Sequence, residues 1–245
     1  MLERLQGISL DALDERASLL RRVDTKYLIG RNDLQTLIDR LGSDHDALEI
    51  DGRRTFAYRS VYFDSPGLRC FHDHVHGRRP RFKVRTRCYL DAGECQLEVK
   101  FKTHDDETDK RQADHPAAAA ERLPEQARRF VDASLRELGA EPPASLAPVL
   151  RTEFERCTLA AREGGSRVTA DLGLRLSTLD GRQARLAPGL ALVESKTEDG
   201  SGRADELLAE LEIEPVSISK YHAGIALLVE PDPRGETETL RRYFG

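Results

Sequence analysis

The chain has 245 residues, of which 39% are hydrophobic and 33% charged, and its formal net charge is -5 at pH 7. This length suits one large domain with a sizeable core, so residues 1–245 are expected to form a single domain. No run of about 18 apolar residues occurs, and the N-terminus lacks the apolar centre of a signal peptide, which predicts a cytoplasmic protein. An acidic chain without a general basic surface also argues against a nucleic-acid binder.

The helical patterns come at four places along the chain. The expected helices span residues 31–41, 117–138, 204–212 and 217–230. Asn32 or Asp33 is expected to cap the first helix and Ser219 the last, and Pro124 is expected to kink the second. The Pro-rich segment 140–148 is the best candidate for a connection between two halves of the chain.

Seven other segments follow the two-residue period of strands, so we expect an α+β fold with a closed sheet or a sandwich. The expected strands span residues 24–30, 58–64, 81–90, 94–102, 152–161, 166–177 and 190–196. Ala92 and Gly93 lie at the tip of a tight hairpin. Cys88 and Cys95 flank this turn, but a cytosolic setting predicts that they stay reduced, like Cys70 and Cys157, and the absence of CxxC spacing argues against a zinc ribbon.

The charged residues of the expected strands follow the same two-residue alternation. In "RFKVRTRCYL" (81–90), Lys83, Arg85 and Arg87 occupy every second position and therefore share one face of a strand. Lys100 and Lys102 repeat the pattern in the neighbouring strand. Because like charges placed opposite each other destabilise a hairpin, we expect an anionic partner to relieve them.

Cations occur on the alternating faces of most of the expected strands. The set comprises Lys26, Arg59, Lys83, Arg85, Arg87, Lys100, Lys102, Arg156, Arg167, Lys196 and Lys220, accompanied by Asp24, Glu98, Asp171 and Glu194. Two interpretations stay open for each strand, an ordinary solvated face with weak ion pairs or the wall of a lumen that encloses a polyanion. The recurrence of the pattern favours the lumen.

Eight segments, in chain order, carry a resemblance to a known family: VDTKYLIG, YRSVYFDS, KVRTRCY, LEVKFK, FERCTL, RVTADLGLRL, LVESK and SKYHAGIAL. They resemble the polyphosphate polymerase domain of the vacuolar transporter chaperone (VTC) family, in the triphosphate tunnel metalloenzyme (CYTH-like) superfamily. The similarity runs from about Asp24 to Leu228. It implies an eight-stranded antiparallel β-barrel, the triphosphate tunnel, with flanking helices and a C-terminal helix near one end.

The resemblance also implies roles for individual residues. The implied phosphate contacts are Lys26, Arg59, Arg85, Arg87, Lys100, Arg156, Arg167, Lys196 and Lys220, and the alternation adds Lys83 and Lys102. Glu194 resembles the glutamate that binds Mn²⁺ or Mg²⁺, and Glu98 is expected as a second metal ligand. The expected catalytic residues are Glu194, Lys220, Arg85 and Arg87.

Two positions depart from the family pattern, since Asp24 stands where the superfamily carries glutamate and Phe154 where the family often shows tyrosine. Other residues have simpler interpretations. Asp171 is expected to cap a turn and Tyr221 to pack. His72, His74 and His76 are expected to share a strand face at a hairpin end rather than to bind a metal.

The expected activity is transfer of the γ-phosphoryl group of a nucleoside triphosphate such as ATP to a polyphosphate chain, with release of the diphosphate. Such a transfer needs charge neutralisation, alignment and a metal ion. Two alternatives stay open, a metal-dependent triphosphatase or tripolyphosphatase in which water is the acceptor, and a non-catalytic polyphosphate-binding domain. The sequence does not specify the nucleotide, the polymer length, the oligomeric state or a membrane partner that receives the product.

Overall fold

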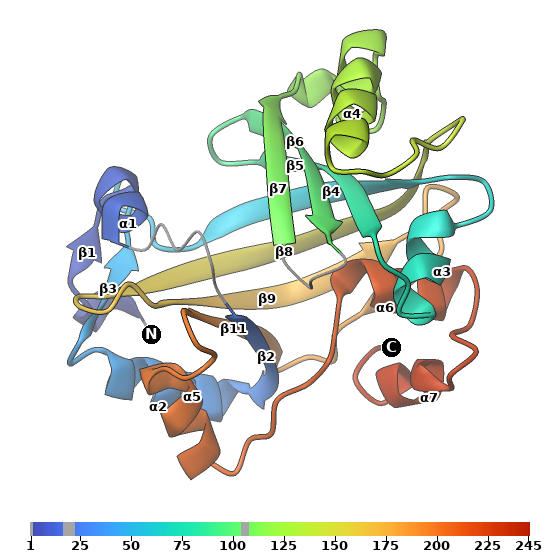
Figure 1. Cartoon of the computed structure of the whole chain (residues 1–245). Coiled ribbons are helices and arrows are strands. Elements are labelled where there is room, and N and C mark those ends of the chain that lie inside the picture. The colour runs from blue at the N-terminus through green and yellow to red at the C-terminus, as the bar shows by residue number, and fades with distance from the viewer. Residues whose placement is uncertain (1, 17–22, 104–107) are drawn as a thin grey trace. The chain divides into compact units, whose positions relative to one another are not determined.

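A computed structural model describes residues 2–16, 23–103 and 108–245. The chain forms two compact units, each assembled from segments that lie apart in the sequence (Figure 1). Unit 1 comprises Met1–Phe56, Phe154–Leu174 and Leu186–Ile218, and unit 2 comprises Ala57–Glu153, Arg175–Arg185 and Ser219–Gly245. The two longest strands, β8 (Ala147–Ala161) and β9 (Arg167–Ser177), contribute residues to both units.

Eight strands form one path of hydrogen-bonded neighbours in the order β2-β11-β9-β8-β4-β5-β6-β7. The remaining strands of this path are β2 (Val23–Gly30), β4 (Phe56–Asp64), β5 (Arg81–Tyr89), β6 (Glu94–Lys102), β7 (Thr108–Asp114) and β11 (Leu190–Thr197). The pairings of β11 with β2 and β9 and those that link β4 to β7 are antiparallel, which confirms the expected α+β fold. The path has the expected eight strands, and its closure into a barrel stays a prediction.

Three short strands lie off this path. They are β1 (Gly7–Ile8), β3 (His45–Leu48) and β10 (Gln183–Arg185). The β1–β3 pair is parallel, whereas β3 pairs with β8 and β10 with β9 in antiparallel fashion.

In unit 1, the strands divide into an apolar and a charged face because successive side chains point to opposite sides. The register places Tyr27 opposite Val193 and Ile29 opposite Ala191. These residues form a buried core with helices α2 (Arg31–Leu41) and α5 (Arg203–Glu210), which lie together beside β2 in Figure 1. The other face of β2 and β11 carries the charged residues Lys26, Glu194 and Lys196, together with Leu28 and Leu192.

Unit 2 follows the same rule. Val84 lies opposite Val99 and Phe82 opposite Phe101, and all four side chains are buried. Helix α4 (Glu125–Glu137) packs against β6. Helix α6 (Lys220–Leu228) contacts both α3 (Arg69–Val75) and α7 (Glu236–Arg241) (Figure 1).

The helix ends differ in part from the expectations. Gly30, not Asn32 or Asp33, precedes the first turn of α2, and no side chain caps it. Ser219 does cap α6, because its Oγ accepts a hydrogen bond from the backbone N of His222. Pro124 directly precedes α4 and does not kink the helix. Proline is well tolerated at this position, because the backbone N–H that it lacks would have no partner in the first helical turn. Only a short 3₁₀ turn, η2 (Ala117–Ala119), forms in the alanine-rich segment before it.

The expectation of a shared strand face for the three histidines is wrong, because residues 69–75 form the helix α3. The rings of His72 and His76 lie 6.0 Å apart, one helical turn from each other, whereas the His74 ring lies 5.1 Å from that of His222. The helical period of 3.6 residues therefore separates His74 from the other two.

The expectation that all four cysteines stay reduced is also wrong for one pair. Cys88 and Cys95 lie directly opposite each other in the β5–β6 ladder and form a disulfide, with their Cα atoms 4.0 Å apart. Cys70 and Cys157 are free and buried. In the part of the chain that the structure describes, no helix has both the length and the apolar character needed to cross a membrane.

The contact between α6 and β8 depends on a glycine. A Cβ added at Gly224 would clash with both methyl groups of Leu150. Glycine to alanine inside a helix normally raises stability by about 1 kcal/mol. Because the buried Leu150 would have to move, we expect Gly224→Ala to lower the free energy of unfolding by about 1–3 kcal/mol in urea denaturation.

Gly67 provides the matched control, since a Cβ at this position would meet no atom within 4 Å. Gly67→Ala should change the free energy of unfolding by less than about 0.5 kcal/mol. A stabilised Gly224→Ala variant would contradict the close approach of α6 to β8.

Candidate functional site

Glu98 is a buried carboxylate that lies among cations on the charged face of β5, β6 and β7. It is 2% exposed. Its Oε2 accepts from Arg85 Nε at 2.6 Å, and its Oε1 accepts from Gln112 Nε2 at 3.0 Å and lies 3.2 Å from Lys110 Nζ. Burial alone would raise the pKa of Glu98, but the charges of Arg85, Arg87 and Lys110 hold that pKa well below its usual range. Glu98 is therefore an ionised, fully engaged carboxylate.

The cations on this face outnumber that carboxylate. The strand register places Lys83 directly opposite Lys100, and Lys100 directly opposite Lys110. Lys102 lies on the same side of β6 as Lys100. We call the group formed by Lys83, Arg85, Arg87, Glu98, Lys100 and Lys110 the unit 2 cationic face. Like charges placed directly opposite each other destabilise a sheet, so an added anion would stabilise this one.

Residues from distant segments join this face. Tyr62 of β4 lies opposite Arg85, and its hydroxyl accepts a hydrogen bond from Arg85 Nη1 at 3.0 Å. Burial would raise the pKa of Tyr62, but the charges of Arg85, Arg87 and Lys220 lower it. Lys220 is the first residue of α6 and directly precedes Tyr221, whose ring lies 5.1 Å from that of Tyr62. Lys83 Nζ donates to the helix cap Ser219 Oγ at 2.8 Å.

A buried carboxylate holds the first turn of α6 in place. Asp64, at the end of β4, is fully buried and accepts hydrogen bonds from the backbone N of Ser65 at 2.7 Å and of Cys70 at 3.0 Å. It also accepts from the Tyr221 hydroxyl. Burial and Asp64 together raise the pKa of Tyr221, whose ring lies 5.1 Å from that of Tyr62. Tyr221 is buried, in agreement with its expected packing role.

Unit 1 has a charged face of its own, centred on Glu194. Glu194 lies opposite Lys26 in the β2–β11 ladder, with Lys26 Nζ 3.7 Å from Oε1, and Lys196 Nζ lies 2.5 Å from Oε2. Burial would raise the pKa of Glu194, but Lys196, Lys26 and Arg156 lower it. Burial lowers the pKa of Lys196 to about 8, against the opposing effect of Glu194 and Asp24.

Arg156 and Asp171 form a bidentate ion pair on this face, with Nε–Oδ1 and Nη2–Oδ2 distances of 2.6 and 2.9 Å. The expectation that Asp171 caps a turn is wrong, because it lies inside β9. The Arg156 guanidinium also lies over the Phe154 ring, 5.2 Å from its centroid. Arg167 lies opposite Lys196, and its Nη2 contacts Asp14 at 3.2 Å.

Arg59 is not brought together with the other cations of unit 2. Ser60 and Tyr62 lie opposite Arg87 and Arg85, whereas Arg59 lies opposite Cys88. Arg59 therefore points to the other side of the sheet, where its Nε donates to Glu153 Oε1 at 2.8 Å. Arg59 is the neighbour of Ser60 in the sequence, and successive side chains of a strand point to opposite sides of the sheet.

The residue pattern does not predict β7, and it therefore does not predict the contacts of Lys110 and Gln112 with Glu98. The segment "TDKRQAD" (108–114) has alanine as its only apolar residue, so the usual strand signal is weak. The remaining signal was the position of Lys110 and Gln112 at alternate residues shortly after the strand 94–102. Tyr62 was also missed, since its role depends on the β4–β5 register.

The two candidate metal ligands differ in their fit to Mn²⁺ or Mg²⁺. Both oxygens of Glu98 already contact hydrogen-bond donors, so Glu98 does not fit a ligand role. Glu194 is ionised, its side chain is 18% exposed and its contact with Lys26 is long. Because these ions keep several waters and need only one or two protein carboxylates beside phosphate oxygens, Glu194 fits.

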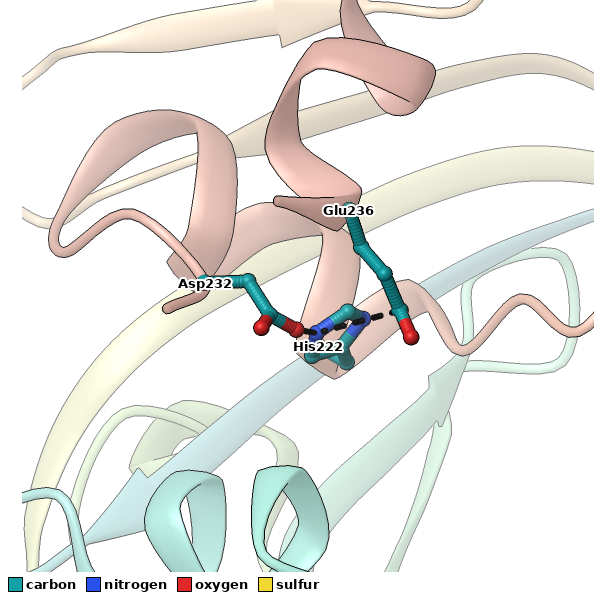
Figure 2. A group of neighbouring side chains, drawn as sticks. All are labelled: His222, Asp232 and Glu236. Carbon is teal, nitrogen blue, oxygen red and sulfur yellow. Dashed lines mark hydrogen bonds and ion pairs between the residues drawn. The ribbon is translucent and has the colours of Figure 1, made fainter. Parts of the chain in front are cut away.

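A second group of ligand atoms lies at the C-terminal end of unit 2, where Figure 2 shows His222, Asp232 and Glu236. His222 Nε2 lies 2.5 Å from Asp232 Oδ2 and 3.7 Å from Glu236 Oε2. Arg234 Nη2, however, lies 2.9 Å from an oxygen of each carboxylate. Burial would raise the pKa of Asp232, but Arg234 and His222 lower it. The guanidinium already provides the positive charge that a metal would supply, so this group is an ion-pair network that ties α6 to the segment before α7.

Comparisons with known proteins identify a family model that matches most of the chain. A family model described as the VTC domain matches residues 21–229. Among solved structures, HpAC1 from Hippeastrum, described as having a dominant triphosphatase activity, is 16% identical with a TM-score of 0.50, and the match covers 86% of this chain and 99% of that one. PH1012 from Pyrococcus horikoshii is 13% identical with a TM-score of 0.42, over 80% and 96% of the two chains. None of the curated proteins matches significantly.

Glu98 allows a direct test of the charge balance. Glu98→Gln would leave Arg85, Arg87 and Lys110 without their shared anion, so we expect the free energy of unfolding at pH 7 to fall by about 3–5 kcal/mol in chemical denaturation. The folded-state pKa of Glu98 is below its unfolded value, so its contribution is present above about pH 4.3 and is lost as the pH falls through the folded-state pKa. The difference between wild type and variant should therefore shrink in acid.

Glu155 is an exposed glutamate of β8 and serves as the matched control. Glu155→Gln should change the stability by less than about 0.5 kcal/mol at either pH. A Glu98→Gln variant as stable as this control would show that the cations do not depend on Glu98.

Proposed function

The chain belongs to the VTC domain family, and from this premise we propose that it is a polyphosphate polymerase. It would transfer the γ-phosphoryl group of a nucleoside triphosphate to the end of a polyphosphate chain. The observation that supports the proposal best is the unit 2 cationic face, where three lysines lie in register across three strands and one buried carboxylate serves two arginines. The oxygens of a phosphate chain could bind these lysines and arginines.

Phosphoryl transfer requires that the protein position the reactants and neutralise their charge, and it requires little covalent chemistry from the protein. In the transfer, the bond from the γ-phosphorus to the bridging oxygen breaks, a terminal oxygen of the polyphosphate bonds to that phosphorus, and the nucleoside diphosphate leaves. The guanidinium groups of Arg85 and Arg87 can each bind two phosphate oxygens, whereas lysines act as mobile point charges along the polymer. Tyr62 and Glu98 hold Arg85 ready for this role.

Five other cations remain proposed phosphate contacts, namely Lys220, Lys26, Lys196, Arg156 and Arg167. Glu194 remains the proposed ligand of Mn²⁺ or Mg²⁺, an ion that neutralises charge on phosphate oxygens when bound. The low pKa of Glu194 keeps its carboxylate ionised at neutral pH, as such a ligand requires. Lys102 is proposed as a further contact beside Lys100.

Hydrolysis is the second candidate function, because the fold of this chain is similar to that of HpAC1, described as a protein with a dominant triphosphatase activity. In that case water would replace the polyphosphate end as the acceptor. A non-catalytic domain that binds polyphosphate would show neither product. The three functions differ in their products and so can be distinguished directly.

The direct test is to incubate the purified protein with ATP and Mn²⁺ and to analyse the products. We expect long-chain polyphosphate on a gel together with released ADP, whereas orthophosphate without polymer would indicate a hydrolase. Glu194→Gln should lower turnover at least about a hundredfold, because the metal ligand is lost. Its affinity for inorganic tripolyphosphate measured without metal should stay within about threefold of wild type. Full turnover in Glu194→Gln would remove Glu194 from the mechanism.

A second test separates the two sides of the sheet. Arg87→Ala removes a cation of the unit 2 cationic face and should weaken tripolyphosphate binding by about 10- to 100-fold in calorimetry, since a hydrogen bond to a charged group is worth about 1.5–3 kcal/mol. Arg59→Ala removes an equal charge from the opposite side and should change the affinity less than about twofold. An equal loss in both variants would indicate binding through net charge alone.

A further inference from the structure

Two tyrosines continue the row of β5 cations beyond Arg87. Lys83, Arg85, Arg87 and Tyr89 lie on the same side of β5, and the register places Tyr58 of β4 directly opposite Tyr89. The two rings lie edge to face with their centroids 5.2 Å apart. The guanidinium carbon of Arg87 lies 5.9 Å from the centroid of the Tyr58 ring. The aromatic pair therefore adjoins the last cation of the row.

The two ends of this row differ in how they are covered. At the Lys83 end, α6 lies over the strand, since Lys83 contacts the helix cap Ser219 and lies 6.0 Å from the centroid of the buried Tyr221 ring. At the other end, the turn 90–93 is exposed, and Tyr58 and Tyr89 are only half-buried. The tyrosine end of the row is therefore the more exposed of the two.

Cross-strand packing explains why the rings of Tyr58 and Tyr89 touch. It does not explain why the two rings lie on the charged side of the strands. Aromatic pairs that stabilise a sheet work equally well on its apolar side, which in these strands carries Val61, Val84 and Val99. Tyr58 and Tyr89 lie instead on the charged side. From Lys83 to Tyr89 the strand extends about 20 Å, enough for a triphosphate followed by a nucleoside.

We infer that Tyr58 and Tyr89 form a subsite for the base of the nucleoside triphosphate, with the phosphates running from Arg87 toward Lys83. This inference rests on the proposed function and adds the direction in which the substrate lies. Every base has a π face that can stack on a tyrosine ring, so the subsite favours nucleoside triphosphates over inorganic triphosphate without selecting strongly among bases.

The experiment compares two ligands that share their phosphates and differ in the nucleoside. We would measure the Kd of ATP and of inorganic tripolyphosphate by calorimetry in EDTA, so that no turnover occurs. In Tyr89→Ala and Tyr58→Ala the Kd of ATP should rise about tenfold, because one stacking surface is lost, while the Kd of tripolyphosphate stays within about twofold. Tyr89→Phe keeps the ring and should bind ATP like wild type.

Leu90 is the matched control, as an exposed neighbour of Tyr89 without an aromatic ring, and Leu90→Ala should leave both Kd values unchanged. If Tyr89→Ala does not fold, Tyr89→Leu tests the same loss of the ring while keeping an apolar side chain. An equal rise in both Kd values would show that the ring acts through Arg87, and an unchanged Kd of ATP would show that it does not touch the base. Either result overturns the subsite, whereas a wild-type protein that binds neither ligand overturns the proposed function itself.

Discussion

The buried carboxylate of Glu98 is the interaction on which the charged face of unit 2 depends. Removing charges from water costs several kcal/mol for each ion unless they are paired, and Arg85 and Arg87 are both largely shielded from solvent. Glu98 offsets part of this cost at the centre of the face, and Tyr62 adds an acceptor for Arg85. The carboxylate balances fewer charges than surround it. Glu98 thereby links cations of β5 and β7 across β6.

The apolar sides of the same strands determine where these charges point. A shift of one residue in the pairing of β5 with β6 would exchange Val84 and Phe82 with the cations and bury the charge in the core. The packing of valine and phenylalanine therefore fixes the register, and the register in turn fixes which cation lies opposite which. Unit 1 uses the same rule, with Tyr27 and Val193 on the core side and Lys26 and Glu194 on the other.

A polar network brings the C-terminal part of the chain to the same face of unit 2. Asp64 links the end of β4 to the start of α3 and to Tyr221 of α6, and Lys83 contacts the cap of α6. The two contacts with α6 connect residues more than 130 positions apart in the sequence. They place the start of α6 beside Lys83 and Tyr62, and they make α6 the cover of one end of the cation row.

Alternation in the sequence was enough to locate seven strands and to place Lys83, Arg85 and Arg87 on one side, because the direction of successive side chains is a local property of an extended backbone. It also identified the family. Only the tertiary structure decided which charges meet, since pairing depends on the register between strands. That register moved Arg59 to the other side of the sheet, joined Arg156 to Asp171, and brought Lys110 to Glu98 from a strand that has almost no apolar residues. Cys88 and Cys95 flank one hairpin turn, and the β5–β6 register places them directly opposite each other as a disulfide. His74 meets His222 only because α3 packs against α6, a contact between segments far apart in the chain that no local pattern of residues contains.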